Sequence, residues 1–426
     1  MAAEHRLTET RSGVRVVTEA MPGVRSAALG FFIGTGSRTE REPEAGLSHL
    51  LEHLLFRGTA RFASEEIDQI FDAMGAELNA GTGKETTSVY SRVLDRHLPR
   101  AFEVMADMVF APALEDVEPE REVVLEEIAM YEDEPQEKVF DVLGEAVFGD
   151  HPLGRAIIGR AEVIAGTPVH EIAAFHSARY QPANVVVAAA GSIDHDELAA
   201  MVEEAVPAMG PGGGALDDGG VPAFAPRTRF ARKATEQVHV CIGGYGLARD
   251  DDRRFALRVL DGIFGGTSSS RLFQEVREKR GLAYAVYSFT GGYAGTGQIG
   301  LYLGTRGDNL DEGLRIIGAE LDRLVEEPAT EAELERSKEN VKGRAVLSLE
   351  STATRMGRLG SSIITGVPVL SVDELIERID AVTLEDLRSV AVELFAPGRL
   401  SAAGVGGDEE RFRAALEPVS AELVAA

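Results

Sequence analysis

The apolar positions along the chain follow strand and helix periods, and the same order of elements occurs twice. Residues 27–56 predict an apolar strand, a glycine-containing turn and a helix, and residues 238–264 repeat that order. Near the end of each half, residues 180–191 and 395–406 both predict a helix end, a turn and a buried strand that leads to a further helix. The sequence therefore predicts two domains with the same fold.

Glycine and proline dominate the middle of the chain, in the stretch AMGPGGGALDDGGVPAFAP. Such a stretch cannot hold a helix or a central strand, so it predicts a linker. We expect an N-terminal domain over residues 1–208, a linker over 209–226 and a homologous C-terminal domain over 227–426. Strands and helices are interleaved without a strict βαβ series, which favours the α+β class, with mostly antiparallel sheets packed with helices.

Residues 46–56 (GLSHLLEHLLF) predict a buried helix with a single polar stripe. His49, Glu52 and His53 fall within an arc of roughly 100°, and leucines fill the rest of the circumference. Histidines at i and i+4 can bind one metal ion through neutral nitrogens, and the adjacent Glu52 can act as general base towards water. The H-x-x-E-H order is typical of zinc peptidases. The alternative, structural histidines with a capping glutamate, would bury three polar groups without a metal.

The third ligand is expected on the acidic helix predicted after Pro119. Glu120 and Glu127 fall within its apolar face, whereas Glu122 and Glu126 fall outside it. That face is formed by Val123, Val124, Ile128, Met130 and Tyr131, with Leu125 as an exception. A carboxylate on a core-facing stripe needs a strong partner such as a zinc ion, so we predict Glu127 as the ligand and Glu120 as its support. The alternative is that both are surface glutamates whose stems lie along apolar surface.

Together these residues resemble those of the pitrilysin-type metallopeptidases, the family of mitochondrial processing peptidase, pitrilysin and insulin-degrading enzyme. The resemblance is greatest to the short bacterial processing-peptidase-like proteins. Residues 56–59 (FRGT) look like the family's extension of the zinc helix, and residues 121–127 (REVVLEE) match the segment whose last glutamate is the third ligand. The resemblance implies the LuxS/processing-peptidase-like metallohydrolase fold, one Zn²⁺ per chain and endopeptidase activity on extended or unfolded peptides.

Residues 78–90 (LNAGTGKETTSVY) are similar to the family's Asn-Ala strand beside the zinc. By themselves they predict an alternating strand with a middle weakened by glycine, which as an edge strand could accept an extended peptide through main-chain hydrogen bonds. Asn79 and Ala80 are therefore candidate substrate-binding residues. An ordinary polar turn between strands is the alternative.

Residues 265–284 look like the family's C-terminal signature, in which Arg277 and Tyr284 match residues that contact the substrate or the oxyanion. Arginine can clamp a peptide carbonyl, and a tyrosine hydroxyl can donate to a developing oxyanion. By its charged neighbours alone, Arg277 would be a solvated helix residue. The second half has LRVLD at residues 257–261, where the zinc motif would repeat, so this domain is expected to support the first.

The family geometry further implies a homodimer that forms a closed chamber. In that arrangement Glu52 of one subunit would act together with Arg277 and Tyr284 of the partner subunit. A non-catalytic scaffold, or a partner subunit of a processing-peptidase-like complex, is the alternative function. Subunits of that kind usually have decayed zinc motifs, whereas every expected residue is present in this sequence.

The composition limits which classes of binding partner and which cellular compartment we expect. A formal net charge of −27 argues against nucleic acid as a partner. This acidity either serves solubility or attracts basic peptides. No apolar run approaches the ~18 residues needed to span a membrane, and the first residues do not resemble an export signal. The single cysteine, Cys241, fits a reducing compartment, so we expect a cytoplasmic protein.

Overall fold

A computed structural model describes residues 5–206, 218–396 and 398–426 of the chain. Residues 209–217 of the predicted linker lie outside the described residues. The chain forms two compact units, and each unit combines three separate stretches of sequence. The first contains Met1–Ile128, Ala156–Asp218 and Val346–Val372, and the second contains Ala129–Arg155, Gly219–Ala345 and Asp373–Ala426.

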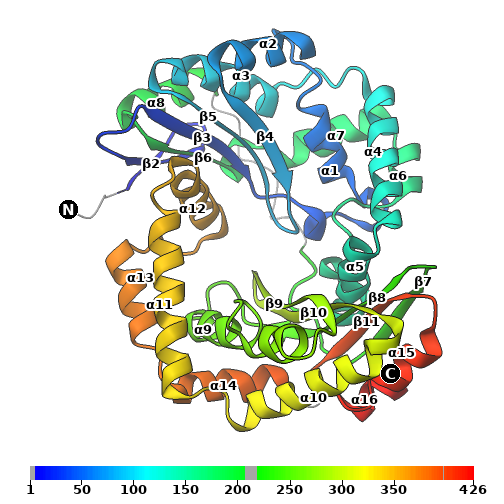
Figure 1. The fold of residues 1–426 in the computed structure, drawn as a ribbon. Coiled ribbons are helices and arrows are strands. Elements are labelled where there is room, and N and C mark those ends of the chain that lie inside the picture. The colour runs from blue at the N-terminus through cyan, green and yellow to red at the C-terminus, as the bar shows by residue number, and fades with distance from the viewer. Residues whose placement is uncertain (1–4, 207–217, 397) are drawn as a thin grey trace. The chain divides into compact units, whose positions relative to one another are not determined.

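The first unit is built on a six-stranded sheet (Figure 1). Its strand order is β1 (Arg6–Glu9), β2 (Arg15–Ala20), β6 (Val185–Gly191), β3 (Ser26–Ile33), β5 (Thr87–Leu94) and β4 (Glu77–Thr82). Neighbouring strands are antiparallel except β2 and β6, which are parallel. Strand β4 is therefore an edge of this sheet, with only one side of its backbone paired within the sheet.

Both faces of this sheet are covered, which strand β3 illustrates. Leu29 and Phe31 belong to the core formed with α1 (Leu47–Leu54), α2 (Ser64–Met74), α3 (Leu98–Phe110), α7 (Val169–Arg179) and α8 (His195–Ala205). Ala28 and Phe32 belong to a second core, with residues of α12 (Thr352–Thr365). Alternate side chains of a strand face opposite sides, so a strand as apolar as β3 requires helices on both.

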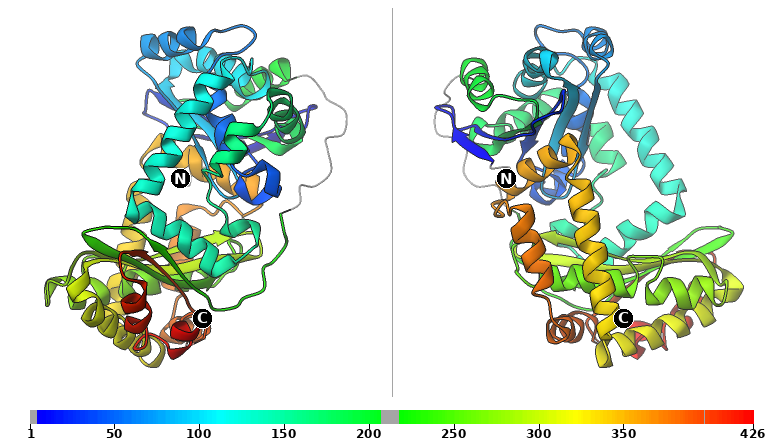
Figure 2. Two further views of the ribbon diagram at one scale, coloured as in Figure 1. Left: turned by 90° about the vertical axis from the view of Figure 1, so that its right-hand side faces the viewer. Right: turned by 60° about the vertical axis from the view of Figure 1, so that its left-hand side comes forward.

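The second unit contains a five-stranded sheet (Figure 2). Its order is β7 (Thr228–Arg232), β11 (Ser401–Gly406), β8 (Gln237–Gly246), β10 (Thr296–Arg306) and β9 (Ala283–Tyr293), with only the pair β7 and β11 parallel. Helix α5 (Pro135–Phe148) covers one face, where its Val139 and Leu143 pack with Cys241 and Tyr302. The helices α9 (Arg254–Phe264), α10 (Leu310–Glu326) and α14 (Leu384–Phe395) pack on the sheet as well.

Six further α-helices lie in the described chain. They are α4 (Val117–Asp133), α6 (Ala161–Gly166), α11 (Glu331–Ser348), α13 (Val372–Asp380), α15 (Glu409–Ala415) and α16 (Ala421–Ala425). Within the described ranges, none of the helices combines the length and the hydropathy that a transmembrane span needs.

The predicted fold class is confirmed, because both units contain a mostly antiparallel sheet packed with helices. Strands β3 and β8, and helices α1 and α9, lie at the repeated positions of the two halves. The compact units nevertheless differ from the sequence halves by one exchange. Helix α5 lies in the N-terminal half of the sequence but belongs to the second unit. Helix α12 lies in the C-terminal half but covers the sheet of the first unit.

Candidate metal centre

Helix α1 presents the predicted polar stripe because its start and its burial are both well defined. Gly46, with φ of 101°, occupies the left-handed region just before the helix, and the Glu40 carboxylate accepts hydrogen bonds from the backbone N–H groups of Gly46 and Ser48 at 2.9 and 2.8 Å. A carboxylate at a helix N-terminus satisfies free donors and complements the helix dipole. Leu50, Leu51 and Leu54 are fully buried, which directs the other side of the helix to the site.

The structure brings His49, His53 and Glu127 together as a possible metal-binding group. The Oε2 atom of Glu127 lies 3.6 Å from Nε2 of His49 and 3.3 Å from Nε2 of His53. Ligand atoms about 2.0–2.1 Å from a tetrahedral zinc ion are roughly 3.3 Å apart, so these separations fit such an ion. Two imidazole nitrogens and one carboxylate oxygen also form a donor set that leaves a fourth position for water.

The protonation of His49 suits a metal ligand. Burial, with a smaller effect of the neighbouring His53, lowers the pKa of His49 to about 4. At neutral pH the ring is therefore uncharged and offers a lone pair. Its Nε2 atom is the one that lies near Glu127, whereas its buried Nδ1 atom has no hydrogen-bond partner among the described residues.

Glu120 orients the second imidazole. Nδ1 of His53 donates a hydrogen bond to Oε1 of Glu120 at 2.8 Å, which leaves the Nε2 lone pair for the side where Glu127 lies. Glu120 is only 4% exposed, and Arg57 forms an ion pair with its other oxygen. The sequence prediction included Glu120 but missed Arg57. Arg57 lies three residues beyond the end of α1, so helix periodicity gave no signal for it.

Glu52 lies on the same stripe and is directed towards the end of strand β4. Burial raises the pKa of its carboxyl, and hydrogen bonds from Thr82 oppose part of that increase. Its Oε2 atom is buried and has no hydrogen-bond partner in the described chain. The Thr82 hydroxyl lies 3.3 Å from that of Thr87, which donates to the carbonyl of Thr35 at 3.1 Å. Thr82 was not among the predicted site residues, although alternation along residues 78–82 places it on one face with Ala80.

The predicted substrate segment is a hairpin rather than one weakened strand. Residues 83–86 form the turn between β4 and β5, and β4 is the free edge. Asn79 and Ala80 lie on that edge strand, and the Asn79 side chain accepts a hydrogen bond from the N–H of Ala80 at 2.8 Å. One edge of the β4 backbone is thus available for an added strand.

The predicted apolar face of helix α4 was wrong in part. Val123, Met130 and Tyr131 are 46%, 65% and 40% exposed, whereas Leu125, the apparent exception, packs against the core. The buried face turns instead towards Arg121, which donates to the carbonyls of Ile164 and Thr167 at the end of α6. A pattern of apolar residues alone cannot predict that a charged side chain is buried because it caps the C-terminus of another helix.

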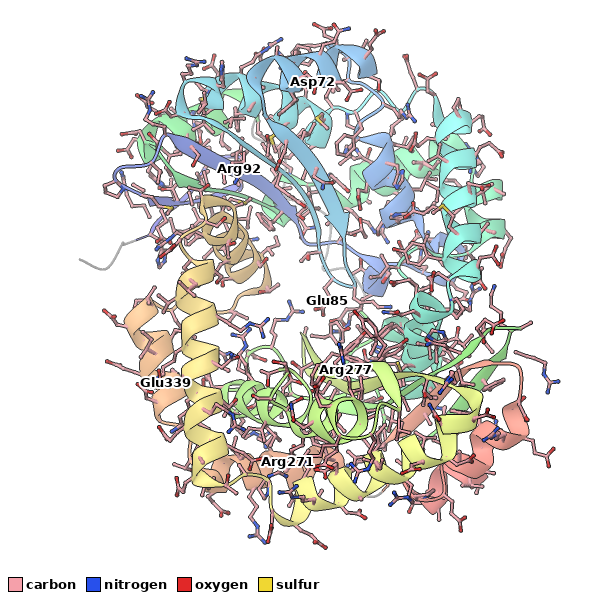
Figure 3. The ribbon with its side chains drawn as sticks, in the orientation of Figure 1. Asp72, Glu85, Arg92, Arg271, Arg277 and Glu339 are labelled. Carbon is pink, nitrogen blue, oxygen red and sulfur yellow. The ribbon has the colours of Figure 1, made fainter. Side chains whose placement is uncertain are left out.

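Arg277 (Figure 3) and Tyr284 lie in the second unit. The two residues contact each other. Arg277 lies in a π-helical turn, Phe273–Glu278, and its Nη1 donates to the Tyr284 carbonyl at 2.9 Å. The guanidinium group also lies 4.5 Å from the centre of the Tyr284 ring. Tyr284 is 78% exposed, so its hydroxyl is accessible at the edge strand β9.

Two family profiles together match most of the chain. The profile of insulinase (peptidase family M16) matches residues 15–161, and that of the peptidase M16 inactive domain matches residues 169–341. An uncharacterized zinc protease of Streptomyces coelicolor is 43% identical over 91% of this chain and 86% of its own length. The chain belongs to peptidase family M16. Another member, an uncharacterized zinc protease of Bacillus subtilis, is 40% identical over 90% of this chain and 94% of its own length.

Solved structures share the fold of this family member. A protease from Helicobacter pylori has a TM-score of 0.87 and 22% sequence identity, with 95% of this chain and all of that chain covered. The peptidase M16 inactive domain protein from Pseudomonas fluorescens has the same TM-score at 23% identity, and the match covers 95% of this chain and 98% of that one. The family assignment made from His49, Glu52, His53 and their surroundings is therefore confirmed.

Proposed function

We propose that this protein is a zinc-dependent endopeptidase that cuts extended or unfolded peptides. The observation that carries the proposal is the convergence of His49, His53 and Glu127 beside Glu52, whose Oε2 atom is buried, with the edge strand β4 next to it. His49, His53 and Glu127 would hold one Zn²⁺ ion per chain. When bound, this ion would polarise a carbonyl oxygen and increase the acidity of water.

Residues of the chain would bind the peptide, transfer the proton and orient the metal ligands. Strand β4 would hold the peptide in an extended form through main-chain hydrogen bonds, at Asn79 and Ala80. Glu52, which Thr82 holds in place, would accept the proton of the attacking water through its free Oε2 atom and transfer that proton to the leaving amine. Glu120 would keep the His53 ring oriented throughout.

The same proposal includes a homodimer with a closed chamber, because the half-buried Arg277 and the exposed Tyr284 form a pair suited to a peptide carbonyl or an oxyanion. Glu52 of one subunit would act with Arg277 and Tyr284 of the partner subunit. We also propose the cytoplasm as the compartment, since Cys241 is a buried free thiol. A non-catalytic scaffold is the competing function.

The direct test is mass spectrometry of unfolded peptides after incubation with the zinc-loaded protein. Parallel samples contain a chelator, the Glu52→Gln variant, or the Glu126→Gln variant as a control, because Glu126 is exposed on the neighbouring helix. We expect cleavage that the chelator and Glu52→Gln abolish and that Glu126→Gln retains. Stoichiometric zinc in a folded protein without any cleavage would instead favour the scaffold.

A further inference from the structure

The residues between strand β3 and helix α1 contact both the β4–β5 hairpin and the metal helix. The backbone N–H of Ser37 donates to the carbonyl of Gly83 at 3.3 Å. That of Arg38 donates to the carbonyl of Lys84 at 2.7 Å, and both carbonyls belong to the turn between β4 and β5. Two residues later, Glu40 accepts the hydrogen bonds that start α1. One short segment thus sets the position of the hairpin turn relative to the metal helix.

The side chain of Arg38 holds the same turn from within the first unit, although it is charged and only 1% exposed. Its Nη1 atom pairs with Oε1 of Glu85, a residue of the turn, at 2.6 Å (Figure 3). Its Nε atom donates to the carbonyl of Asp218 at 2.9 Å, and Nη2 lies 3.4 Å from the Asp218 carboxylate. Charge-assisted hydrogen bonds from a planar guanidinium group fix both distance and direction. Arg38 therefore fixes the place of Glu85.

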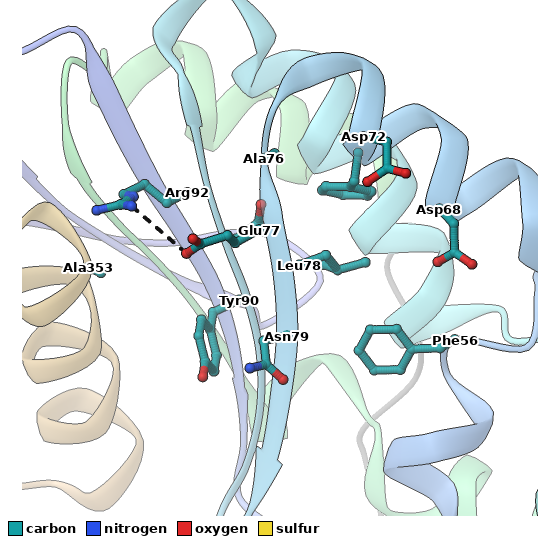
Figure 4. A pocket seen from close by; sticks show the side chains of 12 residues that line it. Phe56, Asp68, Asp72, Ala76, Glu77, Leu78, Asn79, Tyr90, Arg92 and Ala353 are labelled. Atoms are coloured by element: carbon teal, nitrogen blue, oxygen red, sulfur yellow. Dashed lines mark ion pairs between the residues drawn. The ribbon is translucent and has the colours of Figure 1, made fainter.

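The ion pairs at the two ends of the hairpin differ in burial. At the open end, Arg92 of β5 and Glu77 of β4 lie 3.8 Å apart, beside a cavity of about 730 Å³ between β4 and α2 (Figure 4). Both of these side chains are exposed, and exposed pairs stabilise little. At the turn, Arg38 and Glu85 are both shielded from water. The pair at the turn is therefore the one that can hold the hairpin in place.

The turn directly follows the residue that contacts the proposed general base. Thr82, the last residue of β4, donates hydrogen bonds to Glu52, and its hydroxyl lies 3.5 Å from the carbonyl of Ser48 on α1. Thr87, the first residue of β5, donates to the carbonyl of Thr35 at 3.1 Å. A movement of the turn would displace Thr82 and the backbone of β4 relative to the metal centre. A displacement of about 1 Å at the reacting groups can lower a rate by about 100-fold.

We propose that Arg38 is a positioning residue, which holds the hairpin turn through Glu85 and so aligns strand β4 with the metal centre. The inference rests on the proposed peptidase function, in which β4 carries the peptide. Arg38 would act only through the hairpin. Its loss should therefore lower kcat, while the peptide still adds to β4 and zinc still binds to its three ligands.

Steady-state kinetics on a peptide that the wild type cleaves, with the zinc content and the unfolding temperature measured in parallel, test this role. Arg38→Gln and Glu85→Gln each remove one charge of the pair, and the double variant removes both. Arg25→Gln is the matched control, because Arg25 also lies in the first unit and pairs with one carboxylate, that of Asp95, but is exposed. The two single variants and the double variant form a cycle that measures whether Arg38 acts through Glu85.

Gly36→Ala provides an independent test, because it displaces the same turn without changing a charge. A Cβ at Gly36 would lie 2.4 Å from the carbonyl oxygen of Gly83, so the turn must move. Glu85→Gln and Gly36→Ala decide the question if Arg38→Gln does not fold. Hydrogen exchange of residues 77–87 reports how firmly the hairpin is held in each variant, without using cleavage.

We expect Arg38→Gln, Glu85→Gln and Gly36→Ala to lower kcat about ten- to hundredfold, with KM and zinc content within about twofold of the wild type. The losses in the two charge variants should not add, and hairpin exchange should become faster in all three variants. Arg25→Gln should match the wild type.

A lower unfolding temperature with an unchanged kcat per zinc-loaded molecule would show a merely structural role and overturn the inference. Hairpin exchange that does not respond to Arg38→Gln would overturn it as well. Neither result would affect the peptidase function. Faster hairpin exchange in the variants of a protein that binds zinc but cleaves no peptide would overturn the peptidase function, and would leave intact the holding of the hairpin by Arg38.

Discussion

Glu120 accepts a hydrogen bond from Nδ1 of His53 at 2.8 Å while Arg57 pairs with its second oxygen. One buried carboxylate thus determines which nitrogen of His53 faces Glu127. The arrangement shows that the orientation of the candidate ligands depends on a residue more than sixty positions away in the sequence, and that Arg57 in turn holds this residue.

We expect Glu120→Gln to weaken zinc binding by about 10–100-fold, because the amide orients the imidazole less well and leaves Arg57 without its partner. Competition for Zn²⁺ with a chromophoric chelator measures this affinity. Glu122→Gln, two residues away and exposed, should leave it unchanged. An affinity equal to that of the wild type in Glu120→Gln would show that the hydrogen bond does not support a metal ligand.

Thr82→Val should lower kcat about tenfold with a small change in KM, because it removes the hydroxyl that holds Glu52 but keeps the shape of the side chain. Thr82→Ser keeps the hydroxyl and should restore most of the rate. Steady-state kinetics on a cleaved peptide, with the zinc content measured in parallel, separate the two variants. Similar rates for valine and serine would exclude a positioning role of this hydroxyl.

Gly360→Ala should destabilise the first unit by about 1–3 kcal/mol, since a Cβ there would lie 2.1 Å from the Phe32 ring and force the two apart. Gly357→Ala, on the same helix α12, is the control, because nothing lies within 4 Å of its Cβ position. That change should be neutral or stabilising by up to about 1 kcal/mol. Urea unfolding followed by circular dichroism compares the two, and equal midpoints would contradict the close packing of α12 on β3.

The ion pair of Glu333 with Arg271 should make the second unit sensitive to acid. Hydrogen bonds from Arg271 lower the pKa of Glu333 to about 2, below the ~4.3 expected in the unfolded chain. The folded state therefore binds fewer protons, and this stabilisation is present above pH ~4 and lost as the pH falls towards 2.

A comparison of the wild type with Glu333→Gln tests this dependence. At neutral pH the variant should be less stable, by about 1–3 kcal/mol, and the difference should narrow steadily below pH ~4. Thermal unfolding over a series of buffers measures it. A difference that stays constant with pH would mean that the charge of Glu333 does not stabilise the fold.

The sequence by itself determined the elements and the family. The leucines around His49, Glu52 and His53 required a buried helix with one polar stripe, and the repeated strand patterns required two similar sheets, because periodicity reports which side of each element is removed from water. It also singled out Glu127 and Glu120, although three of the five residues that defined the apolar face of their helix are exposed.

Only the tertiary structure decided how distant segments combine. Contacts between elements far apart in the chain explain the exchange of α5 and α12 between the sequence halves. They also explain the hydrogen bonds from Thr82 to Glu52 and the cavity between β4 and α2. A periodic pattern shows that a face is buried but not which segment covers it, since any apolar surface of suitable shape gains similar free energy on burial. Which helix covers which sheet is therefore decided by the packing of the whole chain.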